Sequence, residues 1–103
     1  MLNLNGMLSI VMPAYNEEKL IYHSIMETLR IVEKFVPELE IIAVNDGSKD
    51  NSAAIVAQFT DTRIHLIRQE NGGVSAARNR GIEEAQGKYV ACLLYTSDAA
   101  DEL

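Results

Sequence analysis

Short, mainly apolar runs alternate with segments of helical periodicity along most of this chain, and this alternation restricts the fold more than any other feature. The runs lie at residues 9–12, 41–44 and 64–67, and a fourth begins at 88–91. Runs of this kind are typical of strands buried on both faces of a parallel sheet. Each of the first three is followed by a turn rich in Asn, Asp, Glu or Gly. Such turns gather at the carboxyl edge of a parallel sheet, where open α/β proteins bind ligands, so we expect a binding site there.

The segments between the runs have the residue spacing of helices that pack one face against a sheet. The first helix is expected to begin after Asn16, a good N-cap, and to stop at Pro37. The second is short, and the third covers residues 74–86 and ends at Gly87 in the C′ position. The residues expected to face the sheet are Ile21, Ile25, Leu29, Val32, Val36, Ala54, Ile55, Phe59, Val74, Ala77, Gly81, Ile82 and Ala85.

This order of elements predicts an α/β fold, βαβαβαβ with right-handed crossovers. The expected architecture has three layers, αβα, around a mainly parallel sheet, and it corresponds to half of a doubly wound domain. A chain of 103 residues is long enough for one such domain with a buried core.

Charge and hydropathy exclude several classes of protein. The formal net charge of −6 argues against a nucleic-acid binder, which normally carries a basic surface. No apolar run approaches the roughly 18 residues of a membrane span, and the amino terminus lacks the pattern of a signal peptide. We therefore expect a cytoplasmic protein, with the inner face of the membrane as an alternative location for the full-length protein.

Residues 92–102 break the pattern of the rest of the chain. They resemble, letter for letter over ten residues, the translation of a transposase adapter used to build sequencing libraries. We therefore expect residues 1–91 to be the amino-terminal part of a longer domain and residues 92–103 to be a non-native tail. Removing the three acidic residues of the tail from the total of 15 leaves 12 against 9 basic residues, a net charge of −3. The part before the tail contains no cysteine, so the compartment cannot be inferred from Cys92.

Residues 8–91, about four-fifths of the chain, resemble the nucleotide-binding start of a family 2 glycosyltransferase with the GT-A fold. The resemblance rests on three motifs in order, SIVMPAYNEE at 9–18, VNDGSKD at 44–50 and NGGVSAARNRG at 71–81. It implies an enzyme that moves a sugar from a nucleotide diphosphate donor, often a UDP-sugar, to an acceptor hydroxyl with inversion at the anomeric carbon. The implied partners are the nucleotide-sugar donor and a glycan or lipid-linked acceptor in polysaccharide synthesis.

The first two motifs supply candidates for recognition of the nucleotide base. Asp46 is an acceptor-only group suited to the imide N–H of a uracil ring, although it could instead form an Asx turn. Pro13, Ala14 and Tyr15 would line the base pocket, with Tyr15 as a stacking surface or as an ordinary loop aromatic. Glu17 lies near this pocket in the resembling enzymes, but a glutamate in the first turn of a helix also interacts favourably with the helix dipole.

The third motif supplies candidates for binding the diphosphate. A glycine pair before a helix, Gly72 and Gly73, allows close approach of a ligand and directs backbone N–H groups at anions. Arg78 could reach the diphosphate with its forked set of donors. The alternative is a plain turn followed by a solvated surface cation.

The resemblance also implies a divalent cation, Mg²⁺ or Mn²⁺, held by an Asp-x-Asp element after the fourth strand and neutralising the leaving diphosphate. The expected non-native tail stands at that place, and Asp98 and Asp101 have the wrong spacing for the element. The carboxylate that would act as general base toward the acceptor lies farther along the family's sequence. We therefore expect no catalytic residue and no metal ligand within these 103 residues, and no activity from the chain by itself.

Two other classes of protein were weighed against the glycosyltransferase. A non-catalytic nucleotide-binding α/β module would keep the pocket and lack the metal site, and only the residues after Ala91 would distinguish it. A dinucleotide oxidoreductase is disfavoured, because the turn at residues 13–16 is not G-x-G-x-x-G and no phosphate-binding loop of the G-x-x-x-x-G-K-[ST] type occurs.

Overall fold

The computed structural model describes residues 6–14, 20–47, 52–70 and 72–93. Strands and helices alternate along this part of the chain, as the sequence predicts. The elements are β1 (Leu8–Ala14), α1 (Ile21–Val32), β2 (Leu39–Asp46), α2 (Ser52–Ala57), β3 (Ile64–Gln69), α3 (Val74–Glu84) and β4 (Tyr89–Cys92).

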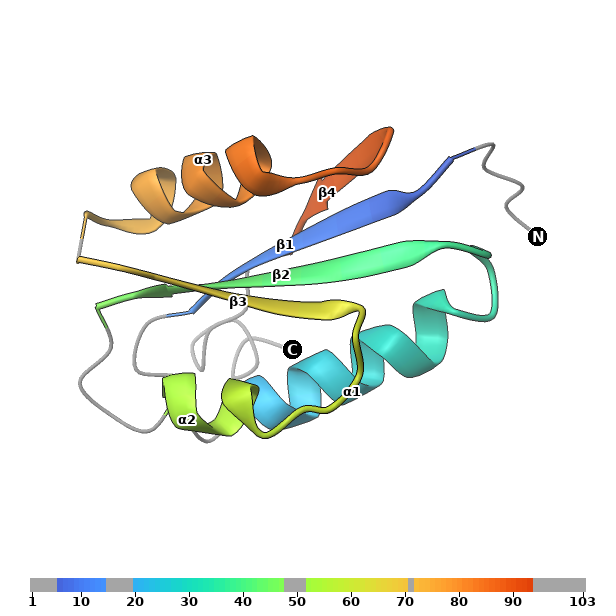
Figure 1. Cartoon of the computed structure of the whole chain (residues 1–103), viewed down its shortest axis with the longest axis horizontal. Helices are drawn as coiled ribbons and strands as arrows, with labels where there is room; N and C mark the ends of the chain where they lie inside the picture. The colour runs from blue at the N-terminus through green and yellow to red at the C-terminus, as the bar shows by residue number, and fades with distance from the viewer. Residues whose placement is uncertain (1–5, 15–19, 48–51, 71, 94–103) are drawn as a thin grey trace, which may run out of the picture.

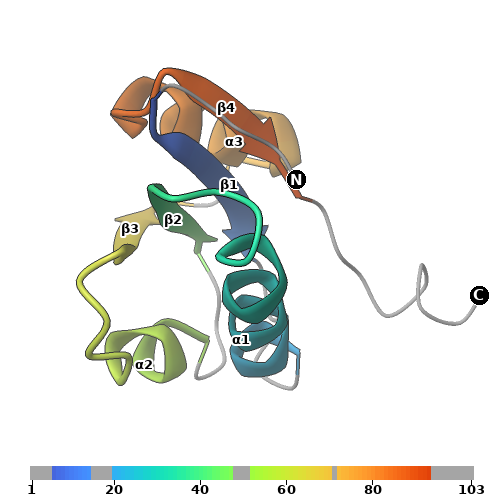
Figure 2. The same ribbon diagram turned by 90° about the vertical axis from the view of Figure 1, so that its right-hand side faces the viewer.

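The four strands form one parallel sheet with the order β3-β2-β1-β4 (Figure 1). The α1 and α2 helices cover one face of the sheet and α3 covers the other, which gives the three layers seen in Figure 2. The predicted three-layer αβα fold is therefore confirmed, with every described strand pair parallel. The chain moves outward from β1 to β3 and then returns to the other side of β1, so right-handed crossovers place α3 on the opposite face from α1 and α2.

The face under α1 and α2 holds the larger part of the core, as the helical spacing predicts. Ile21, Ile25 and Leu29 of α1 are buried against alternate residues of β1 and β2, and Val36 is buried although α1 ends at Val32, before Pro37. The helix begins at Ile21, later than expected, and the predicted N-cap, Asn16, lies outside the described residues.

The inward face predicted for α2 was partly wrong. Ala54 is exposed, whereas Val56 is buried and Ile55 and Phe59 pack on the core as expected. This helix has only six residues, so the apolar pattern is too short to fix its rotation about its axis.

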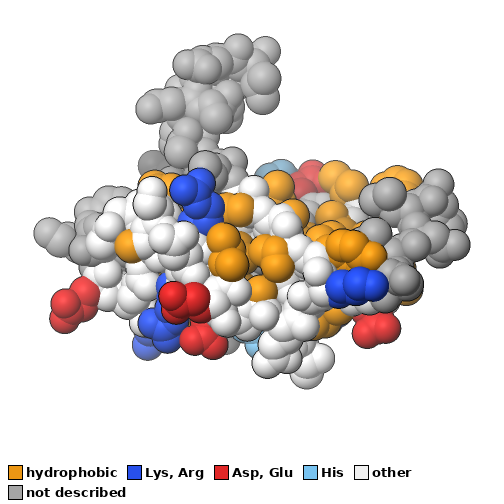
Figure 3. All heavy atoms as spheres, turned by 90° about the horizontal axis from the view of Figure 1, so that it is seen from above, with side chains coloured by type: hydrophobic (Ala, Val, Ile, Leu, Met, Phe, Trp, Pro, Cys, Tyr) orange, Lys and Arg blue, Asp and Glu red, His pale blue; other side chains and the backbone are white. Residues whose placement is uncertain are grey.

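The prediction for α3 was correct at its small residues and wrong at its large ones. Ala77 and Gly81 are buried against the sheet, but Val74 is 55% exposed and Ile82 is 46% exposed. Successive residues of a helix are separated by about 100° around its axis, so the Ile82 side chain points away from the narrow surface through which Ala77 and Gly81 contact the sheet. Figure 3, which looks onto this side of the molecule, shows several apolar side chains at the surface among charged ones.

Gly87 does not act as the expected C′ residue, because α3 ends at Glu84 and Gly87 does not have a positive φ. It allows close packing instead. A Cβ at this position would lie 2.5 Å from the carbonyl oxygen of Met7 and 2.6 Å from Ser9 Oγ, so the chain between α3 and β4 passes directly over the start of β1.

A buried polar cluster at the amino end of the sheet holds this crossing in place, and the sequence did not predict it. Ser9 Oγ donates a hydrogen bond of 2.6 Å to Glu40 Oε2, and the Gln86 N–H donates to the same oxygen at 2.8 Å. The Gly87 N–H donates to Ser9 Oγ at 2.8 Å, and His65 Nε2 lies 3.4 Å from Glu40 Oε1. We call Ser9, Glu40, Gln86 and Gly87 the Glu40 cluster.

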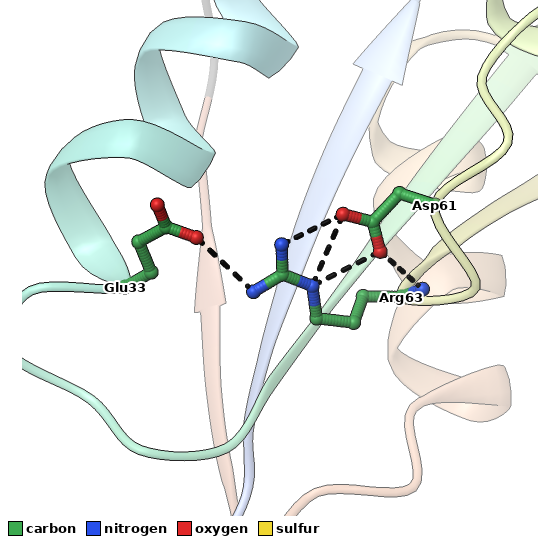
Figure 4. A network of polar contacts seen from close by, with 3 residues as sticks. All are labelled: Glu33, Asp61 and Arg63. Atoms are coloured by element: carbon green, nitrogen blue, oxygen red, sulfur yellow. Dashed lines mark hydrogen bonds and ion pairs between the residues drawn. The ribbon is translucent and has the colours of Figure 1, made fainter.

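A second polar network joins the end of α1 to the turn before β3 (Figure 4). Arg63 donates to Asp61 through its backbone N–H at 2.9 Å and through its guanidinium at 2.7 Å, and also reaches Glu33 at 3.3 Å. The side-chain hydrogen bond from Arg63, followed by the backbone hydrogen bond, lowers the pKa of Asp61 from 3.8 to about 2.

Asp61→Asn is therefore expected to remove an acid-sensitive contribution to stability. A carboxyl group whose pKa is lower in the folded state stabilises the fold above about pH 4, and loses this effect as the pH falls toward 2. The ion pair is partly exposed, so we expect a difference of about 1 kcal/mol between wild type and variant at pH 7 and almost none at pH 2. Urea unfolding at a series of pH values measures it. If the stabilities of wild type and Asp61→Asn changed with pH in parallel, the lowered pKa of Asp61 would be contradicted. Glu33→Gln is the control, because it removes only the weaker contact of Arg63.

Candidate functional site

The carboxyl edge of the sheet brings together the strand ends that the sequence marked for ligand binding. In the strand register Ala14 lies opposite Asn45, and Asp46 lies opposite Gln69. The chain leaves β1 toward one side of the sheet and returns to β4 on the other, which makes the gap between β1 and β4 the topological switch point. Ligands of open α/β sheets bind in the crevice outside the carboxyl ends of the strands at such a point.

Pro13 limits the hydrogen bonding of β1 with β4 at this edge. The Tyr89 N–H donates to the Met7 carbonyl and the Leu93 N–H to the Val11 carbonyl, so alternate residues of β1 direct their backbone groups at β4. Pro13 is the next residue in that series, and it has no N–H to donate. Pairing with β4 ends at Val11, whereas pairing with β2 continues to Ala14.

Two glycines with left-handed backbone conformation border the same edge. Gly47, directly after β2, has a φ of 74°, and Gly73, the N-cap of α3, has a φ of 92°. Residues with a Cβ rarely adopt these angles, so both turns depend on glycine. A Cβ at Gly73 would meet no atom of the described residues within 4 Å.

Arg78 lies one helical turn after this amino end and is half-buried. Its charge acts on Cys92 at the end of β4. Burial raises the pKa of the Cys92 thiol, and the nearby Arg78 cation opposes that rise. The Arg78 cation is therefore within electrostatic range of the end of β4.

The predicted site residues divide into three groups in the structure. Pro13, Ala14, Gly73 and Arg78 border the carboxyl edge. Asp46 is the last residue of β2, so its backbone lies at that edge. Tyr15 and Glu17 lie outside the described residues.

Two features of this edge were absent from the sequence-based prediction. One is the role of Pro13 in ending the pairing of β1 with β4. The other is Gln69, which pairs in register with Asp46 at the end of β3. The sequence signal for Gln69 was its place directly after an apolar strand, among several other polar residues.

A divalent cation was expected from the family resemblance. Within residues 6–14, 20–47, 52–70 and 72–93, no group of three or more His, Cys, Asp and Glu side chains is arranged to hold a metal ion. The described residues by themselves therefore do not supply a metal site. In the same part of the chain, no helix combines the length and the apolar character needed to cross a membrane.

A hollow of about 390 Å³ lies away from the carboxyl edge, between α1 and the segment before β3, with Met26, Phe59 and the Asp61–Arg63 pair among its lining. None of the predicted site residues lines it. Its charged side chains already form ion pairs, Arg63 with Asp61 and Glu33, and Arg30 with Glu27 outside the lining, so it is less suited to a charged ligand than the carboxyl edge.

Comparison with known proteins agrees with this geometry. The sequence matches the family description "Glycosyl transferase family 2" over residues 9–93. It is 43% identical over 105 residues to the uncharacterized glycosyltransferase YibD of Escherichia coli K12, covering 100% of this chain and 28% of YibD. It is 35% identical over 88 residues to WfgD of Escherichia coli, named as a UDP-Glc:alpha-D-GlcNAc-diphosphoundecaprenol beta-1,3-glucosyltransferase, covering 84% of this chain and 34% of WfgD.

A solved structure shares the fold. The mannosyltransferase PcManGT from Pyrobaculum calidifontis, in complex with GDP-Man and Mn²⁺, superposes with a TM-score of 0.69 at 24% identity. The match covers 85% of this chain and 27% of PcManGT, and the chain spans between a quarter and a third of YibD and WfgD. The family match extends over most of the described sheet, including both glycine turns and the switch point, and the chain belongs to glycosyl transferase family 2.

Proposed function

We propose that this chain is the donor-binding part of an inverting glycosyltransferase and that it binds a nucleotide diphosphate sugar, a UDP-sugar, at the carboxyl edge of the sheet. The observation that carries the proposal is the convergence at one switch point of the ends of β1, β2 and β4 with the amino end of α3. Three motifs that are far apart in sequence supply the ends of β1 and β2 and the amino end of α3, and β4 follows the third motif. Membership of the family and the UDP-Glc named for the relative WfgD support this choice of donor.

Each candidate residue has a binding role that follows from its chemistry. The Asp46 carboxylate accepts a hydrogen bond from the ring N–H of the base, and Pro13, Ala14 and Tyr15 line the base pocket, with Glu17 next to it. The amide groups after Gly73 and the Arg78 cation stabilise the negative charge that grows on the diphosphate as the sugar leaves. These groups bind and orient the donor. Deprotonation of the acceptor hydroxyl needs a carboxylate base, which we place in the part of the enzyme that follows.

The Asp46 assignment is tested by titrating the ¹⁵N-labelled chain with UDP and following amide chemical shifts. Asp46→Ala is expected to weaken UDP binding by about tenfold or more, since it removes a hydrogen bond to a charged acceptor. Asp61→Ala is the matched control, because it makes the same change of side chain and charge in the turn before β3, at the amino edge of the sheet, and it should leave the affinity unchanged. Equal affinity of wild type and Asp46→Ala would rule out the base-binding role of this residue.

We also propose that the native sequence departs from this one after Ala91. In the structure Cys92 is the last residue of β4 and lies opposite Val11, so the proposed boundary falls inside the strand. Sequencing the source locus beyond codon 91 tests it. An Asp-x-Asp turn in the native frame would complete a metal site next to Arg78, whereas a frame that encodes residues 92–103 and stops would disprove the boundary.

A further inference from the structure

We propose that Gln69 reads the base of the donor together with Asp46, and that its side-chain amide donates a hydrogen bond to the carbonyl group beside the ring N–H. This inference rests on the proposed function. We assign Gln69 a role in selecting the nucleotide base of the donor, and no step of sugar transfer depends on this residue.

The position of Gln69 is set by the sheet. It is the last residue of β3, its Cα is the register partner of Asp46, and it is half-buried. Ile67, two residues earlier on the same strand, packs with Val44 in the cluster under α3. Since side chains alternate along a strand, Gln69 lies on the α3 face as well.

Two glycines lie next to this part of the edge. Gly47 follows Asp46 directly, and Gly73 begins α3 on the same side of the sheet, where a Cβ would meet no atom of the described residues within 4 Å. Arg68, the neighbour of Gln69, is exposed and belongs to the opposite face by the same alternation. Of the last two residues of β3, Gln69 is therefore the one on the α3 face of the sheet. Asp46, its register partner on β2, belongs to the same face.

The chemistry of a Gln–Asp pair selects among bases. A carboxylate accepts hydrogen bonds only, whereas a primary amide also donates. Uracil presents an N–H flanked by carbonyl oxygens, and guanine presents an N–H beside one carbonyl oxygen. Both patterns match an acceptor next to a donor. Cytosine presents a ring nitrogen that accepts hydrogen bonds, beside an amino group that donates. Its ring nitrogen would therefore lie against the Asp46 carboxylate, and neither of these two acceptors could donate a hydrogen bond to the other. The pair thus favours uracil and guanine over cytosine.

The test uses the full chain and compares titrations with UDP and CDP, followed by amide chemical shifts. Wild type should bind UDP more tightly than CDP. Gln69→Glu has nearly the same shape but turns the donor into an acceptor, so it should oppose the uracil carbonyl and accept from the cytosine amino group. We expect the ratio of UDP to CDP affinity to fall by about tenfold or more, a change typical of a reversed hydrogen-bond partner.

Arg68→Gln is the matched control, because it changes the net charge by the same amount on the neighbouring residue. It should shift both affinities together and leave their ratio unchanged. An unchanged ratio in Gln69→Glu, with Asp46→Ala still weakening UDP, would overturn the role of Gln69 and leave the proposed function intact. Absence of any nucleotide binding by wild type would overturn both.

Discussion

Glu40→Ala is expected to lower the free energy of unfolding by about 3 kcal/mol, although it removes a buried charge. The carboxylate is 5% exposed and accepts hydrogen bonds from Ser9 Oγ and the Gln86 N–H. Without it the buried Ser9 hydroxyl and the partly buried Gln86 N–H both lose their acceptor. The Ser9 oxygen would still accept from the Gly87 N–H, but its O–H would have lost the acceptor to which it donates. The loss of one buried and one partly buried hydrogen bond, together with the cavity left by the side chain, outweighs the gain from removing a desolvated carboxylate.

Urea unfolding at pH 7 measures this effect, and Glu38→Ala is the matched control. Glu38 is an exposed glutamate two residues earlier, so its replacement should change stability by no more than about 0.5 kcal/mol. If the two variants were equally stable, the Glu40 cluster would contribute nothing measurable. Glu40→Gln keeps one accepting oxygen and should lie between wild type and Glu40→Ala.

Gly81→Ala is expected to destabilise the protein by about 2 kcal/mol or more, even though alanine is the better helix former. Helix propensity alone predicts a gain of about 1 kcal/mol. Packing predicts the opposite, because an added Cβ at this buried position would overlap the side chain of Val11 in the central strand. Overpacking of a rigid core typically costs about 1 to 3 kcal/mol and occasionally more, so the sign of the measured change decides between the two effects.

A double-mutant cycle isolates the contact between α3 and β1. Val11→Ala costs stability by itself, but it removes the atoms that the new Cβ would meet. Gly81→Ala made in the Val11→Ala background should therefore be close to neutral or stabilising. Asn79→Ala, on the exposed side of the same helix, controls for propensity and should be neutral or slightly stabilising. A stabilising Gly81→Ala in the wild-type background would contradict the close packing.

Periodicity predicted the parts of the fold that depend on apolar residues at regular spacing. It placed all four strands, and it identified the buried face of α1, where Ile21, Ile25 and Leu29 recur every four residues. It was wrong at α3, where the contact with the sheet is made through Ala77 and Gly81. Periodicity shows which residues are apolar and does not show that the smallest of them allow the closest approach.

The Glu40 cluster could not be predicted from sequence, because a glutamate in a strand is usually expected at the surface. Only the register of β1 with β2, and the return of the chain at Gly87, bring its partners together. Similarly, Gly73 and Arg78 were found through the third motif, whereas Gln69 becomes a candidate only when its register with Asp46 is known.

The order of the strands also affects how the protein can fold while it is synthesised. The central strand, β1, is made first, and β2 can pair with it once residue 46 has emerged from the ribosome. Its other neighbour, β4, is the last of the four, so Leu8 meets Tyr89 only after almost all of the described chain is complete. Until then one edge of the central strand remains unpaired, and an exposed strand edge promotes association between chains. Slower translation over residues 47–88 would prolong this vulnerable interval.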